Sequence, residues 1–188
     1  GNDNISGTAT TAAAAAATTT NTITADHIIA DSSTTDADVL TVTTSTDFTA
    51  TPTVVGIETI NFTLESVTAG NAIYDVSVDN MAANTYNIDV NKTGSPVAQS
   101  IVSGVKSGAT VAFTTDFSTA ATVNGKTDNE ALTVTSSADT TTVNSAGTLT
   151  AATVTVSGTT NTAAGRTIAS DSDAAFTATT TAADMTIQ

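Results

Sequence analysis

Cysteine and tryptophan are absent from this chain, and His27 is its single histidine. Without cysteine the chain has no disulfide, no thiol nucleophile and no thiolate ligand for zinc. Its cations are few and scattered (Lys92, Lys106, Lys126 and Arg166), whereas nucleic-acid binding needs clustered Lys and Arg against the phosphates. No apolar run approaches the roughly 20 residues of a membrane-spanning helix. We therefore expect no nucleic-acid partner and no membrane insertion.

Charged and aromatic residues are also scarce, at 12% and 4% of the 188 residues. An average soluble domain is about 25% charged, so the 46 threonines supply much of the polarity here, beside 33 alanines. The charge that is present is acidic: 18 Asp and Glu against 4 Lys and Arg give a formal charge of -14. Carboxylates gathered in turns without basic partners repel one another, and bound Ca²⁺ would relieve that repulsion.

Short segments in which every second residue is apolar recur along the chain. This alternation places the apolar residues on one face of a strand, and the Val and Thr that dominate it suit a pleated surface. Helix signals are weak, although the alanine run at 12–17 could be helical by propensity alone. The alternating segments are 40–43, 57–64, 74–78, 86–90, 132–135 and 154–157.

The apolar centres of the segments follow one another at intervals of 8–13 residues from Val78 onward. Such spacing suits a β-sandwich or barrel, and equally a solenoid whose coils each contain two or three strands. Small β-branched side chains stack well in a narrow coil, and the aromatic residues that usually build sandwich cores are few. We therefore predict an all-β chain with a β-solenoid of the β-roll or parallel β-helix type, and keep a β-sandwich as the alternative.

Composition divides the chain into three parts. Residues 1–56 and 127–188 are β segments rich in Thr, with Ala and Asp, whereas residues 57–126 contain most of the large side chains. We expect this middle part to form broader coils or an inserted β segment. Because residues 1–7 already contain part of a repeat, we expect the chain to be a piece of a longer protein.

The acidic turns are the candidate metal sites. The first residues read G-N-D-N-I-S-G, close to a calcium-binding nonapeptide in which glycines form the turn, aspartate supplies a charged oxygen and an apolar residue points inward. Ca²⁺ takes 6–8 oxygen ligands, so one turn needs a neighbouring turn to complete a site. We predict Ca²⁺ as the cofactor and its ligands among Gly1, Asp3, Asp26, Asp31, Asp36, Asp38, Asp128, Glu130, Asp171 and Asp173.

Two motifs carry a family resemblance. Residues 1–7 resemble the RTX repeats of bacterial proteins that leave the cell by type I secretion. Residues 55–61, V-G-I-E-T-I-N, resemble the G-[IV]-E-x-[ILV]-N element of Caulobacter-type surface-layer proteins and related RTX-like adhesins. The strong Thr and Ala bias, the missing cysteine and the acidic balance are similar to that family, although tandem glycine-rich nonapeptides are lacking. The resemblance implies a secreted, calcium-dependent β-solenoid that assembles into a coat on the surface of a Gram-negative cell.

The function expected from the sequence is therefore structural. We predict a subunit of an extracellular calcium-dependent assembly at the cell surface, most simply a surface layer, which self-associates into a lattice or filament and has cell-surface polysaccharide as a further candidate partner. The alternative is a section of a large secreted adhesin or of an extracellular filament. No catalytic constellation is found, and His27 has no partner that the sequence can locate.

A third interpretation comes from T-x-T triplets, which occur at 8–10, 22–24, 41–43, 133–135, 148–150, 153–155 and 177–179. A flat ladder of such triplets would order water or bind polysaccharide. It requires one triplet per coil in register, and the spacing of the triplets along the sequence is irregular.

Overall fold

The structure is a computed structural model of residues 1–188. It describes residues 2–9, 23–33, 36–44, 47–66, 73–92, 97–114, 118–126, 131–136, 140–144, 151–156, 166–170, 175–180 and 185–187. The alanine run at 12–17 lies outside these ranges.

The described residues form β-strands and turns and contain no helix, which confirms the all-β prediction. Every alternating segment named above overlaps a strand. The strands are β1 (Asn4–Ala9), β2 (Ile28–Ala30), β3 (Val39–Thr44), β4 (Thr53–Val55), β5 (Thr59–Ser66), β6 (Ile73–Ser77), β7 (Thr85–Lys92), β8 (Val97–Val105), β9 (Thr110–Phe113), β10 (Ser118–Gly125), β11 (Ala131–Ser136), β12 (Thr140–Asn144), β13 (Ala151–Val156), β14 (Arg166–Ser170), β15 (Ala175–Thr180) and β16 (Met185–Ile187).

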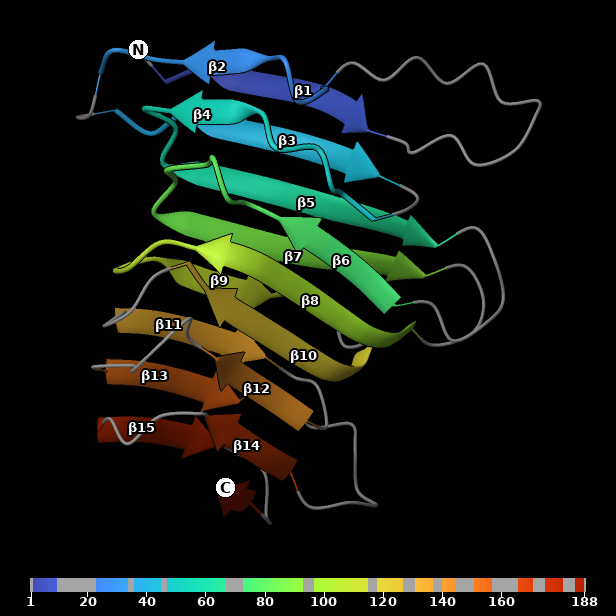
Figure 1. The fold of residues 1–188 in the computed structure, drawn as a ribbon, viewed down its shortest axis with the longest axis vertical. Coiled ribbons are helices and arrows are strands. Elements are labelled where there is room, and N and C mark those ends of the chain that lie inside the picture. Colours follow the sequence, from blue (N-terminus) through green and yellow to red (C-terminus); the bar gives the residue numbers. More distant parts are fainter. Residues whose placement is uncertain are drawn as a thin grey trace.

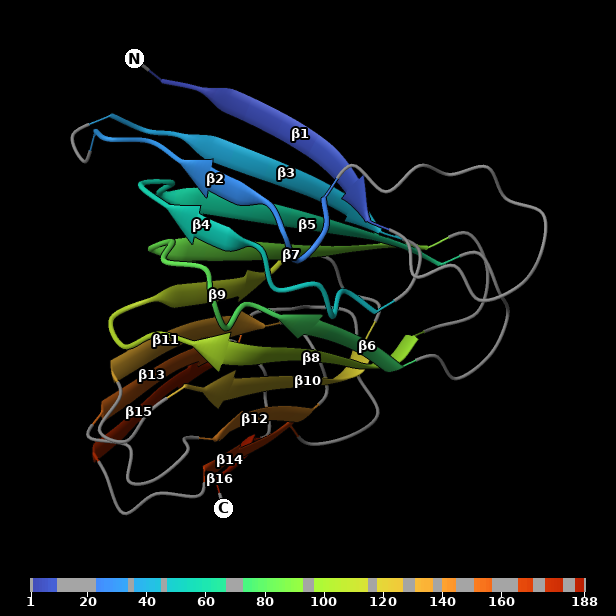
Figure 2. The ribbon, with the colours of Figure 1, turned by 45° about the horizontal axis from the view of Figure 1, so that its top comes forward.

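Odd-numbered and even-numbered strands lie in different sheets. The odd strands form one eight-stranded sheet in the order β1-β3-β5-β7-β9-β11-β13-β15. The even strands form a six-stranded sheet from β6 to β16 and a two-stranded sheet, β2-β4. Figure 1 shows the arrows of the two sets pointing in opposite directions, and Figure 2 shows the sets as two layers.

Pairing between described strands is parallel throughout. It differs in this respect from the antiparallel sheets of an immunoglobulin-type sandwich. We call each odd-numbered strand with the even-numbered strand that follows it one repeat unit. Neighbouring units differ in length: Asn4 pairs with Val39, 35 residues on, whereas Val39 pairs with Thr59, 20 residues on.

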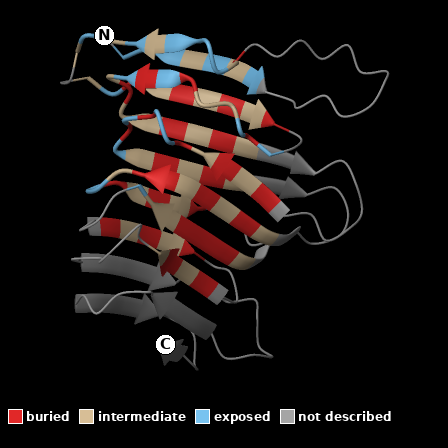
Figure 3. Ribbon diagram, in the orientation of Figure 1, coloured by how far each residue is buried: buried red, intermediate tan, exposed pale blue. Residues whose placement is uncertain are grey.

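One hydrophobic core lies between the layers. Residues are buried alternately in the central strands, as in β3, where every second residue is buried, and Figure 3 shows the same banding on β5 and β7. Equivalent apolar residues of successive units stack in columns, such as Leu40, Ile60 and Tyr86. Phe48 and Phe62 meet in this core with ring centroids 5.2 Å apart. The apolar half of each alternation therefore builds the core.

The polar half of each alternation forms rows on the outer face of the larger sheet. Four consecutive strands place Thr59, Thr85, Thr110 and Thr133 in one register row. The T-x-T triplets of β11, β13 and β15 are also in register, with 133–135 paired to 153–155 and these to 177–179. The irregular sequence spacing is taken up by the turns, so the ladder that the triplets require is present in the backbone register of these strands.

The larger sheet is continuous across residues 56 and 126, since β3 pairs with β5 and β9 pairs with β11. The three-part division of the chain stays a prediction. Among the described residues, no helix has the length and apolar character needed to cross a membrane.

Candidate metal centre

Carboxylates stand directly before the first three odd-numbered strands. Asp3 precedes β1, Asp38 precedes β3 and Glu58 precedes β5. The ladder of backbone hydrogen bonds includes these residues: Val39 N–H donates to the carbonyl oxygen of Asp3 at 2.9 Å, and Thr59 N–H donates to that of Asp38 at 3.1 Å. Because parallel strands begin at the same edge of a sheet, three carboxylates from three units are stacked there.

The stacked side chains bond from one unit to the next. The amide N–H of Asp3 donates to Oδ1 of Asp38 at 2.6 Å, and the amide N–H of Asp38 donates to Oε2 of Glu58 at 3.0 Å. The carboxylates of Asp38 and Glu58 thus each use one oxygen to accept a backbone N–H from the preceding unit. Since each carboxylate has two oxygens and about four acceptor positions, further capacity remains at each residue.

Asp31 joins the stack from the end of β2, where glycine allows a close approach. The Asp31 N–H donates to the carbonyl oxygen of Val55 at 3.0 Å, and its Oδ2 accepts the N–H of Ser33 at 2.6 Å. Gly56 has a φ of 75°, and a Cβ at this position would lie 2.2 Å from the carbonyl oxygen of Asp31. Only glycine therefore fits beside Asp31, both for backbone conformation and for space.

The carboxylates form two groups that share one residue. Asp3, Asp31 and Asp38 each have a carboxylate oxygen within 4.8 Å of the others, and the same holds for Asp36, Asp38 and Glu58. We call these five residues the acidic cluster. A hydrogen bond from Ser33 is the main cause that lowers the pKa of Asp36 below its usual value. The set contains oxygen ligands only, which are the ligands that hard cations such as Ca²⁺ prefer.

Asp38 is the residue that needs a further partner. Its exposed fraction is 0%, and its Oδ2 has no hydrogen-bond partner among the described residues. Burying a carboxylate without an opposite charge or hydrogen-bond donor costs on the order of several kcal/mol of folding free energy. The neighbours of Asp38 in both groups carry the same negative charge. The lysines with described side chains bond elsewhere: Lys106 Nζ donates to the carbonyl of Ala82, and Lys126 Nζ donates to that of Asp79.

The predicted ligands fall into three sets. The structure brings Asp3, Asp31, Asp36 and Asp38 together. Asp26 is not in the acidic cluster: it lies in the exposed turn closed by His27 N–H and the carbonyl of Thr24 at 3.1 Å. The remaining predicted ligands, Gly1, Asp128, Glu130, Asp171 and Asp173, lie outside the residues that the structure describes.

Sequence reasoning missed Glu58 as a candidate ligand. The residue lies in the V-G-I-E-T-I-N motif, 20 residues after Asp38, and the motif was interpreted as a family signal. The signal that would have found it is the repeat itself. An acidic residue directly before an alternating strand occurs at Asp38 and again at Glu58.

A separate acidic pair lies at the start of the six-stranded sheet. The N–H of Asp75 on β6 donates to Oδ1 of Asp47 at 3.0 Å, and Oδ1 of Asp75 has no hydrogen-bond partner among the described residues. Burial is the main cause that raises the pKa of Asp75, and the negative charge of Asp47 raises it further. With two carboxylates instead of five, this pair offers fewer ligands than the acidic cluster.

No protein-family model matches this chain. Searches of curated proteins and of solved structures give no match either. The residues themselves therefore carry the functional argument.

Proposed function

We propose that the chain is a section of a β-solenoid and that Ca²⁺ binds in its acidic cluster. Consecutive strands alternate between the two layers, and each strand pairs in parallel with the strand two places further on, except at the step from β4 to β6, which belong to different sheets. A chain that returns in this way winds one coil per repeat unit. Because each unit adds a strand to the same edge, the architecture grows in one direction and buries its apolar face only by stacking.

The observation that carries the calcium proposal is Asp38. Its unpartnered Oδ2 is buried among four further carboxylates from three repeat units. A divalent cation would neutralise this charge and supply the missing partner. A cation held by Asp3, Asp31 and Asp38 would link β1, β2 and β3, and one held by Asp36, Asp38 and Glu58 would link β3 and β5.

We propose a structural function for the whole chain: a subunit of an extracellular, self-assembling protein such as a surface layer. Support comes from the acidic balance, the absence of cysteine, the Thr-rich rows on the outer face and the two motifs that resemble RTX-like surface proteins. A coat needs repeated, rigid, mutually binding units, and stacked parallel strands supply the first two properties.

The linear order of the strands also favours a second candidate, a section of an adhesin stalk or filament. The larger sheet runs from β1 to β15 in chain order without a reversal, as a rod that projects from a cell would. Electron microscopy of particles formed in calcium separates the two candidates, because a coat gives two-dimensional arrays and a stalk gives single rods.

The first experiment is a thermal melt by circular dichroism, with EGTA and with 2 mM CaCl₂, followed by light scattering as calcium is added back. A ligand at 100 times its Kd stabilises a protein by about 2.7 kcal/mol, which corresponds to a rise in Tm of about 5–10 °C for a chain of this size. We expect a rise of this order together with large particles. Magnesium at the same concentration is the control for ionic strength and should raise the Tm less.

Each part of the proposal has its own contradicting result. An equal Tm in EGTA and in calcium would mean that the carboxylates bind no calcium. A calcium-dependent Tm with scattering that stays monomeric would keep the cation site and overturn the assembly.

A further inference from the structure

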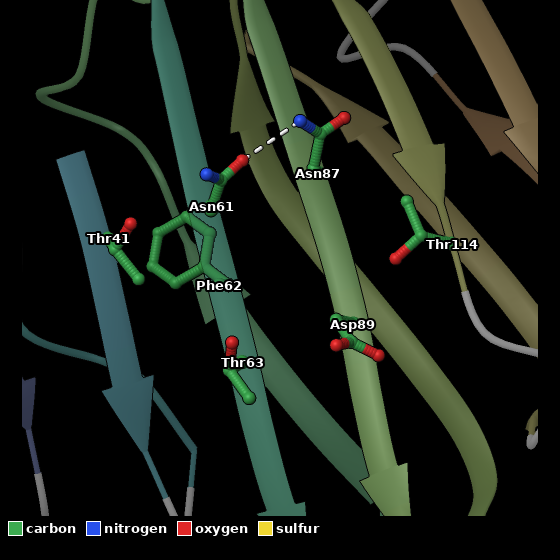
Figure 4. A pocket seen from close by; sticks show the side chains of 7 residues that line it. All are labelled: Thr41, Asn61, Phe62, Thr63, Asn87, Asp89 and Thr114. Atoms are coloured by element: carbon green, nitrogen blue, oxygen red, sulfur yellow. Dashed lines mark hydrogen bonds between the residues drawn. The ribbon is translucent and has the colours of Figure 1, made fainter. Parts of the chain in front are cut away.

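The outer face of the larger sheet has a polar hollow that lies away from the acidic cluster. Its volume is about 390 Å³, within the range of roughly 300–1,000 Å³ that small-molecule sites occupy. Figure 4 shows it from outside the sheet, with the side chains along β3, β5 and β7 and after β9. We call it the outer-face hollow; it is lined by Thr41, Asn61, Phe62, Thr63, Asn87, Asp89 and Thr114.

Two of its side chains hold each other in place. Nδ2 of Asn87 donates to Oδ1 of Asn61 at 2.9 Å, across paired positions of β7 and β5. The next residue in the same row is Ala112 on β9, whose small side chain cannot continue the amide ladder. Because Asn61 and Asn87 are bonded to each other, their amides are oriented before any ligand enters, which lowers the entropy cost of binding.

Asp89 has acceptor capacity that the chain itself does not use. It lies two residues after Asn87 on the same face, and its Oδ1 has no hydrogen-bond partner among the described residues. The terminal torsion of an aspartate side chain is broad, so either oxygen can turn toward a donor in the hollow. A ligand with hydroxyl donors would supply what Asp89 lacks.

The lining selects for a neutral ligand with many hydroxyl groups. Threonine hydroxyls both donate and accept, amides do the same, and the carboxylate accepts, which matches the adjacent hydroxyls of a sugar ring. None of the lining residues is basic, and the carboxylate together with the net charge of -14 would repel phosphate, sulfate or uronic acid groups. One carboxylate among neutral groups is too little charge to recognise a basic peptide.

The rows around the hollow favour a polymer over a single sugar. One row of threonines beside the hollow, Thr59, Thr85, Thr110 and Thr133, runs in register from β5 to β11, with strands spaced about 4.8 Å apart. A chain of sugars lying across the strands along this row would meet a threonine hydroxyl at each step. We propose that the outer-face hollow is a binding site for a neutral polysaccharide chain, an activity separate from the calcium-dependent assembly.

Affinity electrophoresis of the full chain in native gels tests this site. The gels contain dextran, glucomannan or galactan as neutral probes and dextran sulfate as the anionic probe, all with calcium present. We expect at least one neutral polysaccharide to retard the protein and dextran sulfate to have no effect. Asp89→Ala and Asn87→Ala should each weaken retardation at least tenfold, whereas Thr53→Ala, an exposed position on β4 outside the larger sheet, should leave it unchanged.

The calcium-dependent Tm of each variant is measured alongside, because these substitutions leave the acidic cluster intact. Equal Tm shifts show that a loss of retardation is not a loss of fold or of the cation site. Absence of retardation by every neutral probe, stronger binding to dextran sulfate, or unchanged retardation of Asp89→Ala would each overturn the proposal. A monomer-to-dimer change that depends on Asp89 would assign the face to a second copy of the chain instead.

Discussion

At the scale of single residues, Asp38 has opposite effects in the metal-free and the calcium-bound chain. Asp38→Asn keeps an oxygen that accepts the Asp3 N–H but removes the charge that both carboxylate groups share. We expect the Tm in EGTA to rise by roughly a few degrees, because like charges no longer face one another. The calcium Kd, measured by titration calorimetry, should increase about tenfold or more.

Asp26→Asn is the matched control, because Asp26 is exposed and outside both groups. Its Tm in EGTA and its calcium Kd should both equal those of the unmodified chain. If Asp26→Asn weakened calcium as much as Asp38→Asn, general acidity would explain the binding and the acidic cluster would not.

Asp75 makes the stability of the folded chain depend on pH. Its pKa is raised above the ordinary value of 3.8, chiefly by burial, so the folded state binds its proton more readily than the unfolded state. The stability that this adds is complete below about pH 3.8 and is lost as pH rises through the folded pKa. We expect Asp75→Asn to raise the Tm at pH 7 by about 1–2 °C, from an interaction on the order of 0.5 kcal/mol.

The gain should shrink as the pH is lowered toward 4, because the raised pKa of Asp75 lets a growing fraction of the unmodified side chains take up a proton. Melts at pH 7, 5 and 4 in EGTA follow this trend. A gain that stayed constant across the three values would show that burial and Asp47 do not govern the effect.

At the scale of elements, glycine turns set where the strands can begin. Gly56→Ala places a Cβ 2.2 Å from the backbone of Asp31 in a left-handed conformation, which strains the backbone by about 1–3 kcal/mol. We expect the Tm in EGTA to fall by about 3–10 °C and calcium affinity to fall as well, because Asp31 must move.

Gly108→Ala separates the effect of backbone strain from the effect of a steric clash with Asp31. Gly108 has a similar φ of 81°, but nothing lies within 4 Å of its added Cβ. This variant should lose stability through backbone strain alone and bind calcium normally. Equal calcium affinity in the two variants would show that Gly56 does not position Asp31.

The positions of the strands could be predicted from the sequence, whereas the partner with which each strand pairs could not. Alternation of Leu40 with Val42, or Ile60 with Phe62, identifies a strand and its buried face. It does not reveal that odd strands pair with odd strands and even strands with even strands, because turns of different length separate the pairs. For the same reason Asp26 and Asp31 look alike in the sequence, although only Asp31 is bonded back to the Val55 carbonyl and reaches the acidic cluster.

At the scale of the whole molecule, calcium should stabilise one end of the stack. The acidic cluster links the first three odd strands, and in a stacked architecture each unit stabilises its neighbours most. Amide hydrogen exchange with and without calcium measures this. We expect the N–H groups of Val39 and Thr59, which bond to cluster residues, to exchange at least about tenfold more slowly in calcium.

Amides of β10 and β12, several units away, provide the internal reference and should change little. Protection that spread equally to β10 and β12 would mean that the chain opens as one cooperative unit, and that calcium does not act at one end.

Although the repeat units differ in residue number, each adds the same length to the stack of strands. A unit of 35 residues and a unit of 20 residues each advance the stack by one strand, which is about 4.8 Å. The eight strands of the larger sheet thus mark out about 34 Å, whatever the lengths of the turns. Insertions in turns widen the molecule without lengthening it, and only a duplicated unit extends its reach. The extent of the molecule along the stack is therefore set by its number of strands, and it stays the same when residues are added to the turns.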